Sequence, residues 1–489
     1  MSKEDIVNKD QDKLAEMFHN KFGIYPVRVM KLPGAGSARK YYRLAAEDVC
    51  CIGTVSDDLT DSRAFVSLSE LFRKYNINVP EVYAHSADFR YYLQQDLGDE
   101  QLFDLLKRRE GNGDLTDSAV EMVKSSIDEL VKVQCVDPVE IGGCVGYAAF
   151  DRRQVMWDLN YFKYEYLKPS GVAFDENALE DDFERFAECI LGYAAEDRGF
   201  MYRDFQSRNV QIWQGKPWLI DFQGGRIGPR IYDIVSFLWQ AKADFSDTFR
   251  QAMSQLYYTR IKEAFSSKGE SYCYTESEFK SALNVFALFR TLQVLGAYGL
   301  RGLVERKAHF IESIPNALKN LDSLLKIGVA DEYPVLKKVC EQICRDERFE
   351  PDSHSGLLIT VFSFSYKKGY PADYTGNGGG FMFDCRGMHN PGRYEEYKPL
   401  TGRDKPVVDF LEERGEVQKF CATAVDLVSP SVECYTRRGF SNLQIGFGCT
   451  GGRHRSVYCA ERVSRALSEK FPDAAVRLIH REQGIIKDL

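Results

Sequence analysis

The chain has 489 residues, more than one hydrophobic core usually supports, so we expect two or three domains. Hydrophobic residues make up 44% of the sequence, as in an ordinary globular protein, and no run approaches the roughly 18 apolar residues that cross a membrane, which excludes a membrane-spanning protein. No apolar signal segment opens the sequence and its 13 cysteines follow no regular framework, so we expect reduced thiols and a cytoplasmic location.

The net charge of −8 is unevenly distributed. From Leu357 onward there are 19 lysines and arginines against 16 aspartates and glutamates, a net charge of +3. The remaining residues carry 45 basic and 56 acidic side chains, a net charge of −11. The acidic part argues against general nucleic-acid binding, so RNA is not a favoured partner, whereas the basic part leaves room for a local anion site.

The first 97 residues predict a small lobe rich in strands. A helical pattern over 4–22 precedes strand-like runs at 27–32, 41–44 and 49–55, then a helix over 62–75 and two further strands that lead into Gly98. From 98 to 330 the pattern is mostly helical, and Ser118-x-x-Glu121 predicts a capping box at the start of one helix. A two-lobed body with a helical second lobe fits this order.

A glycine-rich turn, GAGSARK, joins the first two predicted strands and can place backbone N–H groups and cations over phosphates. The third strand, VCCIGTV, lacks the lysine that protein kinases carry there to pair with the phosphates, so we expect Arg39 or Lys40 to supply that charge. A second nucleotide contact is expected at the hinge between the lobes. The candidate nucleotide-binding residues in the turn and the hinge are Gly34, Gly36, Ser37, Arg39, Lys40, Gln94 and Asp96.

The stretch 200–233, FMYRDFQSRNVQIWQGKPWLIDFQGGRIGPRIYD, has the spacing that phosphoryl transfer from a nucleotide requires. Asp204 is the candidate general base for a hydroxyl proton. Asn209 and Asp221 offer the oxygen ligands that suit Mg²⁺. Two short strand patterns lie between them and leave Asp221 at a strand end. We expect Arg203 to orient the loop and Asp233 to brace it from the next helix.

The C-terminal part begins after a charged helical and turn-rich linker at 331–356. Strand and helix patterns then alternate over 357–489, with one helix expected around 405–428, so we predict a separate α/β domain. Its loop GFGCTGGRHRS lies between a strand and a helix that starts near His454. Backbone N–H groups at a helix N-terminus and the basic side chains of Arg453, His454 and Arg455 predict an anion receptor.

The same loop also has the spacing Cys449-x5-Arg455-Ser456 of cysteine-dependent phosphatases. A thiol that faces a helix N-terminus and an arginine is expected to be nucleophilic. However, Gly448 stands where such enzymes commonly have a histidine, and no general-acid aspartate loop is evident. The phosphatase remains an alternative.

The segments YRDFQSRNVQI, LIDFQGG and GPRIYDIVSFL resemble the aminoglycoside and choline phosphotransferase superfamily, and the IDFQ and GPRIYD motifs resemble its bacterial anomeric kinases of N-acetylmuramate and N-acetylglucosamine. Over about 20–330 this resemblance implies a protein-kinase-like α+β fold with lobes at 1–97 and 98–330. It also implies ATP and Mg²⁺ as cofactors, Asp204 as base, and Asn209 and Asp221 as metal ligands. Tyr202 departs from the pattern, which usually has histidine there.

The segments DCRGMHNP, PLTGRDKPV and CTGGRHRSVYCAERV resemble, in the same order, the C-terminal domain of the RapZ family of RNase adapters. This resemblance implies glucosamine 6-phosphate binding, homo-oligomerisation, and contacts with RNA and proteins. Gly392-Arg393 replaces a histidine-containing pair of that family. The matching sugar-phosphate residues are Asp384, Arg386, Asn390, Cys449, Thr450, Gly451, Gly452, Arg453, His454, Arg455 and Ser456.

Together these patterns predict an ATP-dependent kinase of a small hydroxylated substrate, most readily an amino sugar, fused to a domain that binds a sugar phosphate and regulates it. Two alternatives stay open. One is a regulatory adapter that binds RNA or proteins in response to an amino-sugar phosphate. The other is phosphatase activity at Cys449.

Overall fold

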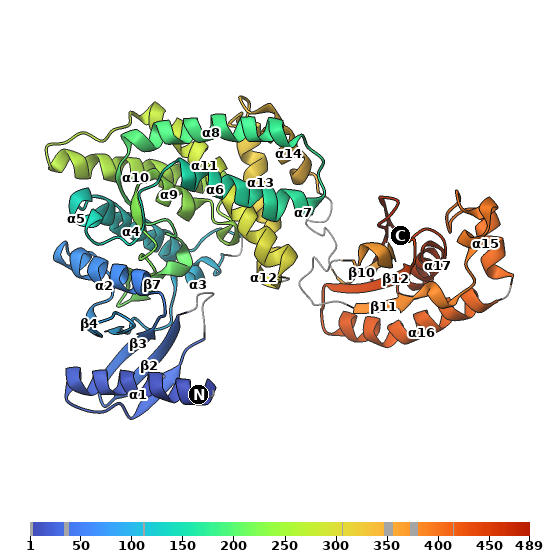
Figure 1. The fold of residues 1–489 in the computed structure, drawn as a ribbon, viewed down its shortest axis with the longest axis horizontal. Coiled ribbons are helices and arrows are strands. Elements are labelled where there is room, and N and C mark those ends of the chain that lie inside the picture. Colours follow the sequence, from blue (N-terminus) through green and yellow to red (C-terminus); the bar gives the residue numbers. More distant parts are fainter. Residues whose placement is uncertain are drawn as a thin grey trace. The chain divides into compact units, whose positions relative to one another are not determined.

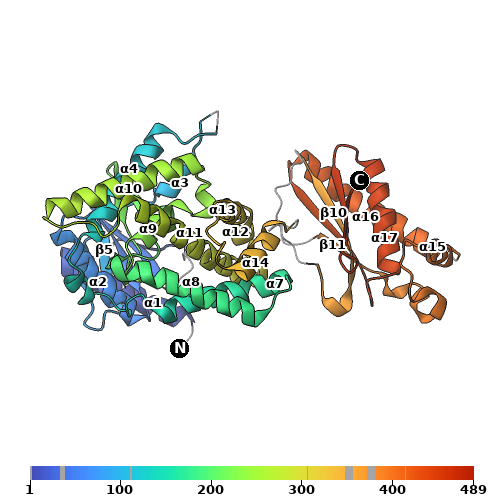
Figure 2. The ribbon, with the colours of Figure 1, turned by 90° about the horizontal axis from the view of Figure 1, so that it is seen from above.

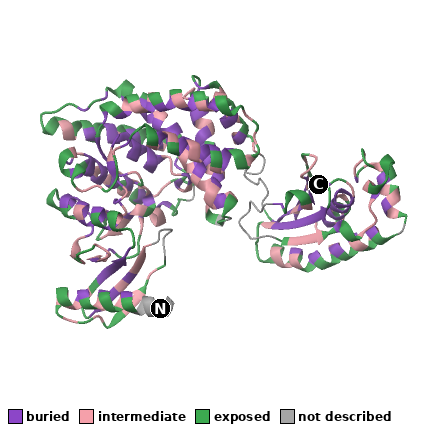
Figure 3. Cartoon of the chain, in the orientation of Figure 1, coloured by how far each residue is buried: buried purple, intermediate pink, exposed green. Residues whose placement is uncertain are grey.

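The computed structural model describes residues 3–33, 39–110, 113–305, 307–346, 356–371, 380–413 and 415–489 (Figure 1). The chain forms two compact units. The first comprises Met1–Ala297 and Asn316–Arg345, and the second comprises Tyr298–Pro315 and Asp346–Leu489. Each has its own buried core (Figure 3).

The small lobe of the first unit is a five-stranded antiparallel sheet in the order β1-β2-β3-β5-β4 (Figure 1). Helix α1 packs on one face, where Leu14 and Phe18 join Cys51 and Val55 in a buried cluster. Gly53 lies beneath this helix, since a Cβ there would come within 2.9 Å of Leu14. The elements are α1 (Lys3–Phe22), β1 (Arg28–Lys31), β2 (Lys40–Ala46), β3 (Val49–Val55), α2 (Leu59–Lys74), β4 (Val82–His85) and β5 (Tyr91–Gln95).

Helix α2 connects the small lobe to the catalytic stretch through stacked aromatic rings. Its N-cap is Asp58, whose side chain accepts a hydrogen bond from the N–H of Asp61. Phe65 of this helix stacks on Tyr92 of β5 and on Phe222, with ring centroids 5.2 and 5.0 Å apart. Phe222 directly follows the candidate metal ligand Asp221, so the packing of α2 supports that site.

The larger lobe is helical, as its sequence pattern predicts. Its helices are α3 (Leu102–Leu106), α4 (Asp117–Gln134), α5 (Pro138–Gly142), α6 (Arg152–Phe162), α7 (Lys168–Ser170), α8 (Glu176–Glu196), α9 (Ile231–Leu238), α10 (Asp247–Ser267), α11 (Glu276–Tyr298), α13 (Ile314–Lys326) and α14 (Pro334–Cys344). The predicted capping box at Ser118 is wrong. Helix α4 begins two residues earlier, because the Thr116 side chain accepts the N–H of Ala119 at 3.3 Å.

One helical stretch in the described residues, Glu276–Val304, is long and apolar enough to cross a membrane. In the structure 61% of its most apolar window is buried inside the protein, as expected for a core helix. Its apolarity is therefore explained by packing.

Two small ladders frame the catalytic stretch. Strands β6 (Gly199–Met201) and β9 (Arg226–Gly228) pair antiparallel, as do β7 (Val210–Trp213) and β8 (Lys216–Leu219). The turn between β6 and β7 carries Asp204 and Asn209, and the turn after β8 carries Asp221. The ladders therefore bring residues 204–221 back to one place.

The second unit has a sheet in the order β11-β12-β10-β13-β14, in which β10 to β13 run parallel and β14 is antiparallel. Helix α17 packs along β10, β12 and β13 (Figure 2). The elements are β10 (Leu358–Ser365), β11 (Gly380–Asp384), α15 (Lys405–Glu412), α16 (Glu416–Arg437), β12 (Asn442–Cys449), α17 (Arg455–Lys470), β13 (Ala475–His480) and β14 (Ile485–Asp488). The single helix expected at 405–428 is wrong, because Gly415 adopts a left-handed conformation (φ 72°) and separates α15 from α16.

Candidate functional site

The turn that carries Asp204 is held from below by the buried carboxylate of Asp233 on α9. The backbone N–H groups of Tyr202 and Arg203 each donate to one of its oxygens at 2.8 Å. The side chain of Gln134 on α4 donates to the same carboxylate at 2.9 Å. Arg203 itself has a left-handed backbone (φ 74°), a conformation that the surrounding bonds must stabilise.

This bracing predicts a pH effect. Burial raises the pKa of Asp233 to about 7, from 3.8, although its three hydrogen-bond donors oppose the rise. A raised folded-state pKa adds stability that is present below pH 3.8 and is lost as the pH rises through 7. We therefore compare the free energy of unfolding of the unmodified protein with that of Asp233→Asn. The difference between them should fall by up to ~1.4 kcal/mol per pH unit between about pH 4 and 7, and it should stay constant above pH 7.

Tryptophan fluorescence during urea unfolding measures this effect, because all four tryptophans lie in residues 157–239 of the first unit. A difference between the two proteins that does not change with pH would contradict the raised pKa.

Asp204 extends from the turn into solvent, with its side chain 54% exposed. Its backbone carbonyl accepts a hydrogen bond from Nδ2 of Asn209 at 2.8 Å. This bond fixes the Asn209 amide so that its Oδ1 faces away from the turn and is left for another partner. The N–H of Ile220 donates to the Asn209 carbonyl at 3.0 Å, which places Asn209 beside Asp221. The three predicted residues are therefore brought together.

Asp221 also has a left-handed backbone (φ 66°), which turns its carboxylate out of the strand direction. Its Oδ1 accepts hydrogen bonds from Gln223 Nε2 at 2.6 Å and from Arg39 Nη2 at 3.1 Å. Phe222 behind it lies against the rings of Phe72 and Tyr202. Asn209 and Asp221 thus present oxygen donors on adjacent backbone positions, a donor set that fits a hard divalent cation.

Arg39 lies beside Asp221, whereas β3 carries no lysine. Alternation along β3 puts Cys51 and Val55 against α1, so Ile52 and Thr54 face α2, and neither is charged. Arg39, just before β2, instead places its guanidinium 3.1 Å from Asp221 and 3.7 Å from Asp61 on α2.

In protein kinases an ion pair between the strand lysine and a helix glutamate orders the nucleotide site. The contact of Arg39 with Asp61 has the same form. Burial opposes the charge of Arg39, but the neighbouring Tyr41 and Asp221 hold the pKa of the guanidinium above its ordinary value. Lys40, the other candidate cation, binds Asp10 of α1 at 2.7 Å instead.

The other residues predicted to contact the nucleotide are not seen beside Asp221 in the described part of the chain. Gly34, Gly36 and Ser37 lie outside the described residues. Gln94 is on β5, and its Oε1 is buried without a partner among the described residues. The carboxylate of Asp96 is engaged by Arg43 at 2.6 Å, so this side chain is committed to the small lobe.

Tyr202 occupies the position of the usual histidine. Its ring is buried among Phe200, Phe205 and Phe222, and its hydroxyl donates to the carbonyl of Ile220. The residue therefore ties the Asp204 turn to the strand before Asp221. This is a structural task that needs no ionisable imidazole.

Three residues of the site were missed by the sequence analysis: Gln134, Asp61 and Arg290. Arg290 lies on α11, and its Nη2 is 3.5 Å from Asp204 Oδ1. Asp61 also accepts a hydrogen bond from the hydroxyl of Tyr147 at 2.7 Å. A charged residue within an apolar helix was the one available signal, since Arg290 interrupts the run FALFRTL.

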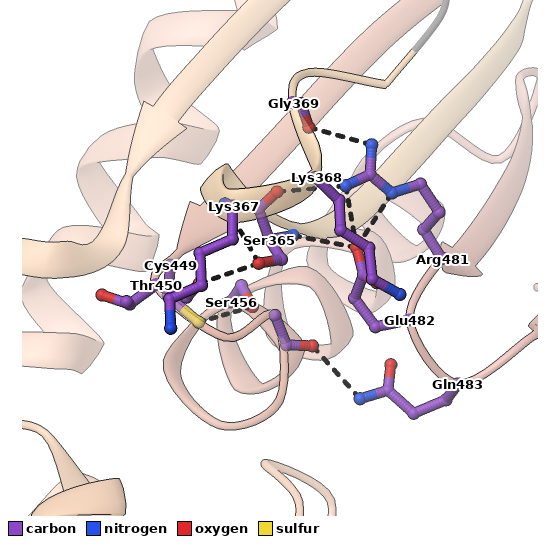
Figure 4. A network of polar contacts seen from close by, with 11 residues as sticks. Ser365, Lys367, Lys368, Gly369, Cys449, Thr450, Ser456, Arg481, Glu482 and Gln483 are labelled. Carbon is purple, nitrogen blue, oxygen red and sulfur yellow. Dashed lines mark hydrogen bonds and ion pairs between the residues drawn. The ribbon is translucent and has the colours of Figure 1, made fainter.

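In the second unit, the loop 449–456 lies where the parallel strands end. The carbonyl of Thr450 accepts the hydroxyl of Ser365, and the carbonyl of Gly452 accepts Gln483 Nε2 at 3.1 Å (Figure 4). Gly452 has φ 65°, and a Cβ there would lie 2.8 Å from the N of Ser365. A glycine is therefore required at this point of the loop.

The three basic side chains of this loop point at carbonyl groups of 386–400. Arg453 donates to Pro399 and Leu400, and His454 Nε2 lies 2.9 Å from the carbonyl of Tyr397. Arg455 donates to Arg386 and Met388, both at 2.9 Å. Each of these side chains therefore has a partner within the protein, although the Nε of Arg455 is buried without one among the described residues. These bonds fix the course of the loop that precedes α17.

Nearby, Asp384 and Arg386 form a salt bridge at 2.7 Å, and Arg386 lies 4.1 Å over the ring of Tyr366. The side chain of Asn390 accepts the N–H of Gly392 at 3.3 Å. Asp384 ends β11 beside the end of β12, so these predicted residues lie at the same edge of the sheet as the loop.

Cys449 is buried at the start of the loop, with its Sγ 3.1 Å from Ser456 Oγ. Burial opposes ionisation, yet hydrogen bonds from Ser456 and from the backbone N–H of Arg453 hold the pKa of this thiol below its ordinary value. The charge of Arg455 also favours the thiolate, while its Nη1 donates to the carbonyl groups of Arg386 and Met388.

Comparison with known proteins matches both units. Residues 29–265 match the model of the phosphotransferase enzyme family, and residues 357–484 match the model of the RapZ C-terminal domain. The match to the phosphotransferase family confirms the predicted two-lobed α+β fold of this part of the chain. The chain joins this phosphotransferase-family domain to a separate RapZ C-terminal domain, as its sequence motifs predict.

Each individual relative matches only part of this chain. A nucleotide-binding protein of Xanthomonas euvesicatoria pv. vesicatoria is 42% identical over 136 residues, which are 28% of this chain and 46% of that protein. A nucleotide-binding protein of Geobacillus kaustophilus is 37% identical over 153 residues, 31% of this chain and 48% of that protein. This chain spans about half the length of these curated relatives.

Among solved structures, choline kinase from Cryptosporidium parvum Iowa II has 11% identity and a TM-score of 0.47, over 70% of this chain and 100% of that one. A choline/ethanolamine kinase family protein from Mesorhizobium loti has 12% identity and a TM-score of 0.42, over 69% and 99%.

Proposed function

We propose that the first unit transfers the γ-phosphoryl group of ATP to a hydroxyl group of an amino sugar, such as N-acetylmuramate or N-acetylglucosamine, in the cytoplasm. The observation that carries this proposal is the grouping of Asp204, Asn209 and Asp221 around one turn, with Arg39 at Asp221. The choice of an amino sugar and of its anomeric hydroxyl rests on the resemblance of the IDFQ and GPRIYD motifs.

In the proposed reaction the sugar hydroxyl oxygen attacks the γ-phosphorus, and the bond to the bridging oxygen of ADP breaks. Asp204 accepts the hydroxyl proton as the new bond forms. Asn209 and Asp221 would hold Mg²⁺, which neutralises charge on the phosphates. Arg39 adds a fixed positive charge on the same side, and Asp233 keeps the Asp204 turn in place.

Purified protein with ATP, Mg²⁺ and a panel of N-acetylated sugars tests the proposal. We expect release of ADP that depends on one of the sugars. Choline and an aminoglycoside serve as the further acceptors of this fold class. Absence of turnover with every sugar, choline and aminoglycoside would refute the kinase.

We further infer that the RapZ C-terminal unit binds a sugar phosphate at the loop 449–456, and that binding there regulates the kinase and supports homo-oligomers. Backbone N–H groups at the start of α17 favour a phosphate. Gly452→Ala should abolish glucosamine 6-phosphate binding measured by calorimetry, because the added Cβ collides with the N of Ser365. Gly439→Ala is the matched control, since Gly439 also has positive φ (69°) but has open space around it.

Two alternatives have tests of their own. The lowered pKa of Cys449 favours a thiolate and hence phosphatase activity, which would appear as aryl phosphate hydrolysis that Cys449→Ser removes. An adapter would shift a structured small RNA in a gel, with steep salt dependence. Gly448 in place of the usual histidine argues against the phosphatase, and the acidic net charge of residues 1–356 argues against the adapter.

A further inference from the structure

Three arginines converge beside the catalytic Asp204. Arg203 precedes it in the turn, Arg226 lies on β9, and Arg290 lies on α11. All three are near Asp158, where burial raises the pKa of the carboxyl and each arginine opposes that rise. Three positive charges therefore face one buried carboxylate and the exposed Asp204.

The arginines are incompletely satisfied by the protein. In each guanidinium, Nη2 has a contact at 3.5 Å: Arg203 to Asp158, Arg226 to the carbonyl of Gly224, and Arg290 to Asp204. Hydrogen bonds of this kind are normally about 2.7–3.2 Å long. The Nε atoms of Arg226 and Arg290 are buried without a partner among the described residues. Buried donors without acceptors are costly, so the protein compensates these guanidinium groups poorly.

Apart from Asp158 and Asp204, the partners of these arginines among the described residues are neutral, as are Tyr232 and Gln293 at Nη1 of Arg290. Gln154 Oε1 accepts from Nη1 of both Arg203, at 3.1 Å, and Arg226, at 2.7 Å, but an amide is neutral. Arg226 lies over the ring of Tyr147 at 5.1 Å. Burial and the nearby Arg203 lower the pKa of Arg226, although the carboxylate of Asp158 opposes this, so one carboxylate does not offset the two effects.

We propose that Arg203, Arg226 and Arg290 form an acceptor subsite for a carboxylate or phosphate carried by the molecule that is phosphorylated. The proposal rests on the proposed kinase function. Arginine holds both anions through paired N–H donors. The cluster adjoins Asp204, whereas the nucleotide side of the site is marked by Asn209, Asp221 and Arg39. The anion is therefore assigned to the acceptor.

Matched acceptors test this subsite. N-acetylglucosamine is the neutral acceptor. N-acetylmuramate is the same amino sugar with a carboxylate-bearing substituent, and N-acetylglucosamine 6-phosphate carries a phosphate instead. We expect kcat/KM to favour one of the anionic acceptors over the neutral one by about 10- to 100-fold, the range of hydrogen bonds to charged groups. Arg226→Gln should reduce that ratio by a similar factor.

The ratio of kcat/KM for the anionic and the neutral acceptor is measured on the same protein. A general loss of folded or active protein lowers both values equally and leaves the ratio unchanged. Arg260→Gln, an exposed arginine of α10 that binds Asp128, should leave the ratio unchanged. A neutral preference in the unmodified protein, or a ratio that Arg226→Gln does not change, would overturn the subsite.

If no acceptor is phosphorylated, the kinase proposal fails, and the subsite is tested separately by thermal unfolding followed with tryptophan fluorescence. Stabilisation by N-acetylmuramate or the 6-phosphate, but not by N-acetylglucosamine, that is lost in Arg226→Gln supports it. Equal effects of all three overturn it.

Discussion

Asp204→Asn should lower kcat by about 10²–10⁴-fold, the usual contribution of a positioned proton acceptor. The amide keeps the size of the side chain but cannot take the hydroxyl proton. Because the backbone of the turn is held by Asp233, the substitution should not disturb the fold. The KM for ATP should change little, since the proposed nucleotide contacts lie at Asp221 and Arg39.

Asp244→Asn is the matched control for this experiment. Asp244 is an exposed aspartate of the same lobe whose carboxylate binds Lys319 at 3.0 Å, and its left-handed backbone (φ 43°) tolerates asparagine. Its kcat should equal that of the unmodified protein. A variant Asp204→Asn that keeps full kcat and a normal unfolding transition would show that the hydroxyl proton leaves by another route.

The grouping of Asp204, Asn209 and Asp221 could be predicted from sequence for a local reason. Only 17 positions separate the first from the last, and the intervening strands pair as one hairpin. Spacing within such a unit determines geometry almost by itself. The two-lobed order of elements was predictable for the same reason, since helical and strand periodicities are local properties of the chain.

Which of Arg39 and Lys40 lies beside Asp221 could not be predicted, because it depends on contacts between distant residues. Arg39 and Lys40 are adjacent in sequence, yet Arg39 reaches Asp221, 182 positions away, while Lys40 turns to Asp10. Side chains of successive residues in a strand face opposite sides. Which side faces the nucleotide is decided by the packing of α1 and α2 on the sheet.

The basic residues of the C-terminal loop show the same limit. Their composition predicts an anion site, but the direction of each side chain is set by carbonyl groups more than 50 positions upstream. Where a helix begins depends on which of several nearby polar side chains caps it. Thr116 and Ser118 are both suitable caps, and the helix begins at the one whose side chain reaches the N–H of Ala119.

Arg39→Met should lower kcat/KM for ATP by about 10²–10³-fold, the loss typical of removing one fixed charge from a phosphoryl-transfer site. Methionine preserves the length and apolar stem of the side chain but neither ion pair. The kcat/KM of Arg39→Lys should lie between that of the unmodified protein and that of Arg39→Met, because an ammonium cannot bridge Asp61 and Asp221 as the planar guanidinium does. Steady-state kinetics with ATP as the varied substrate measures both.

Two further substitutions decide whether Arg39 acts through its position. Arg63→Met removes an exposed arginine from the same helix that carries Asp61, and kcat/KM should stay near that of the unmodified protein. Lys40→Met removes the neighbouring cation, whose partner Asp10 belongs to α1. If Lys40→Met were the damaging change and Arg39→Met harmless, the charge at the phosphates would come from the other side of β2. The ion pair of Arg39 with Asp61 would then serve only to fasten α2 to the sheet.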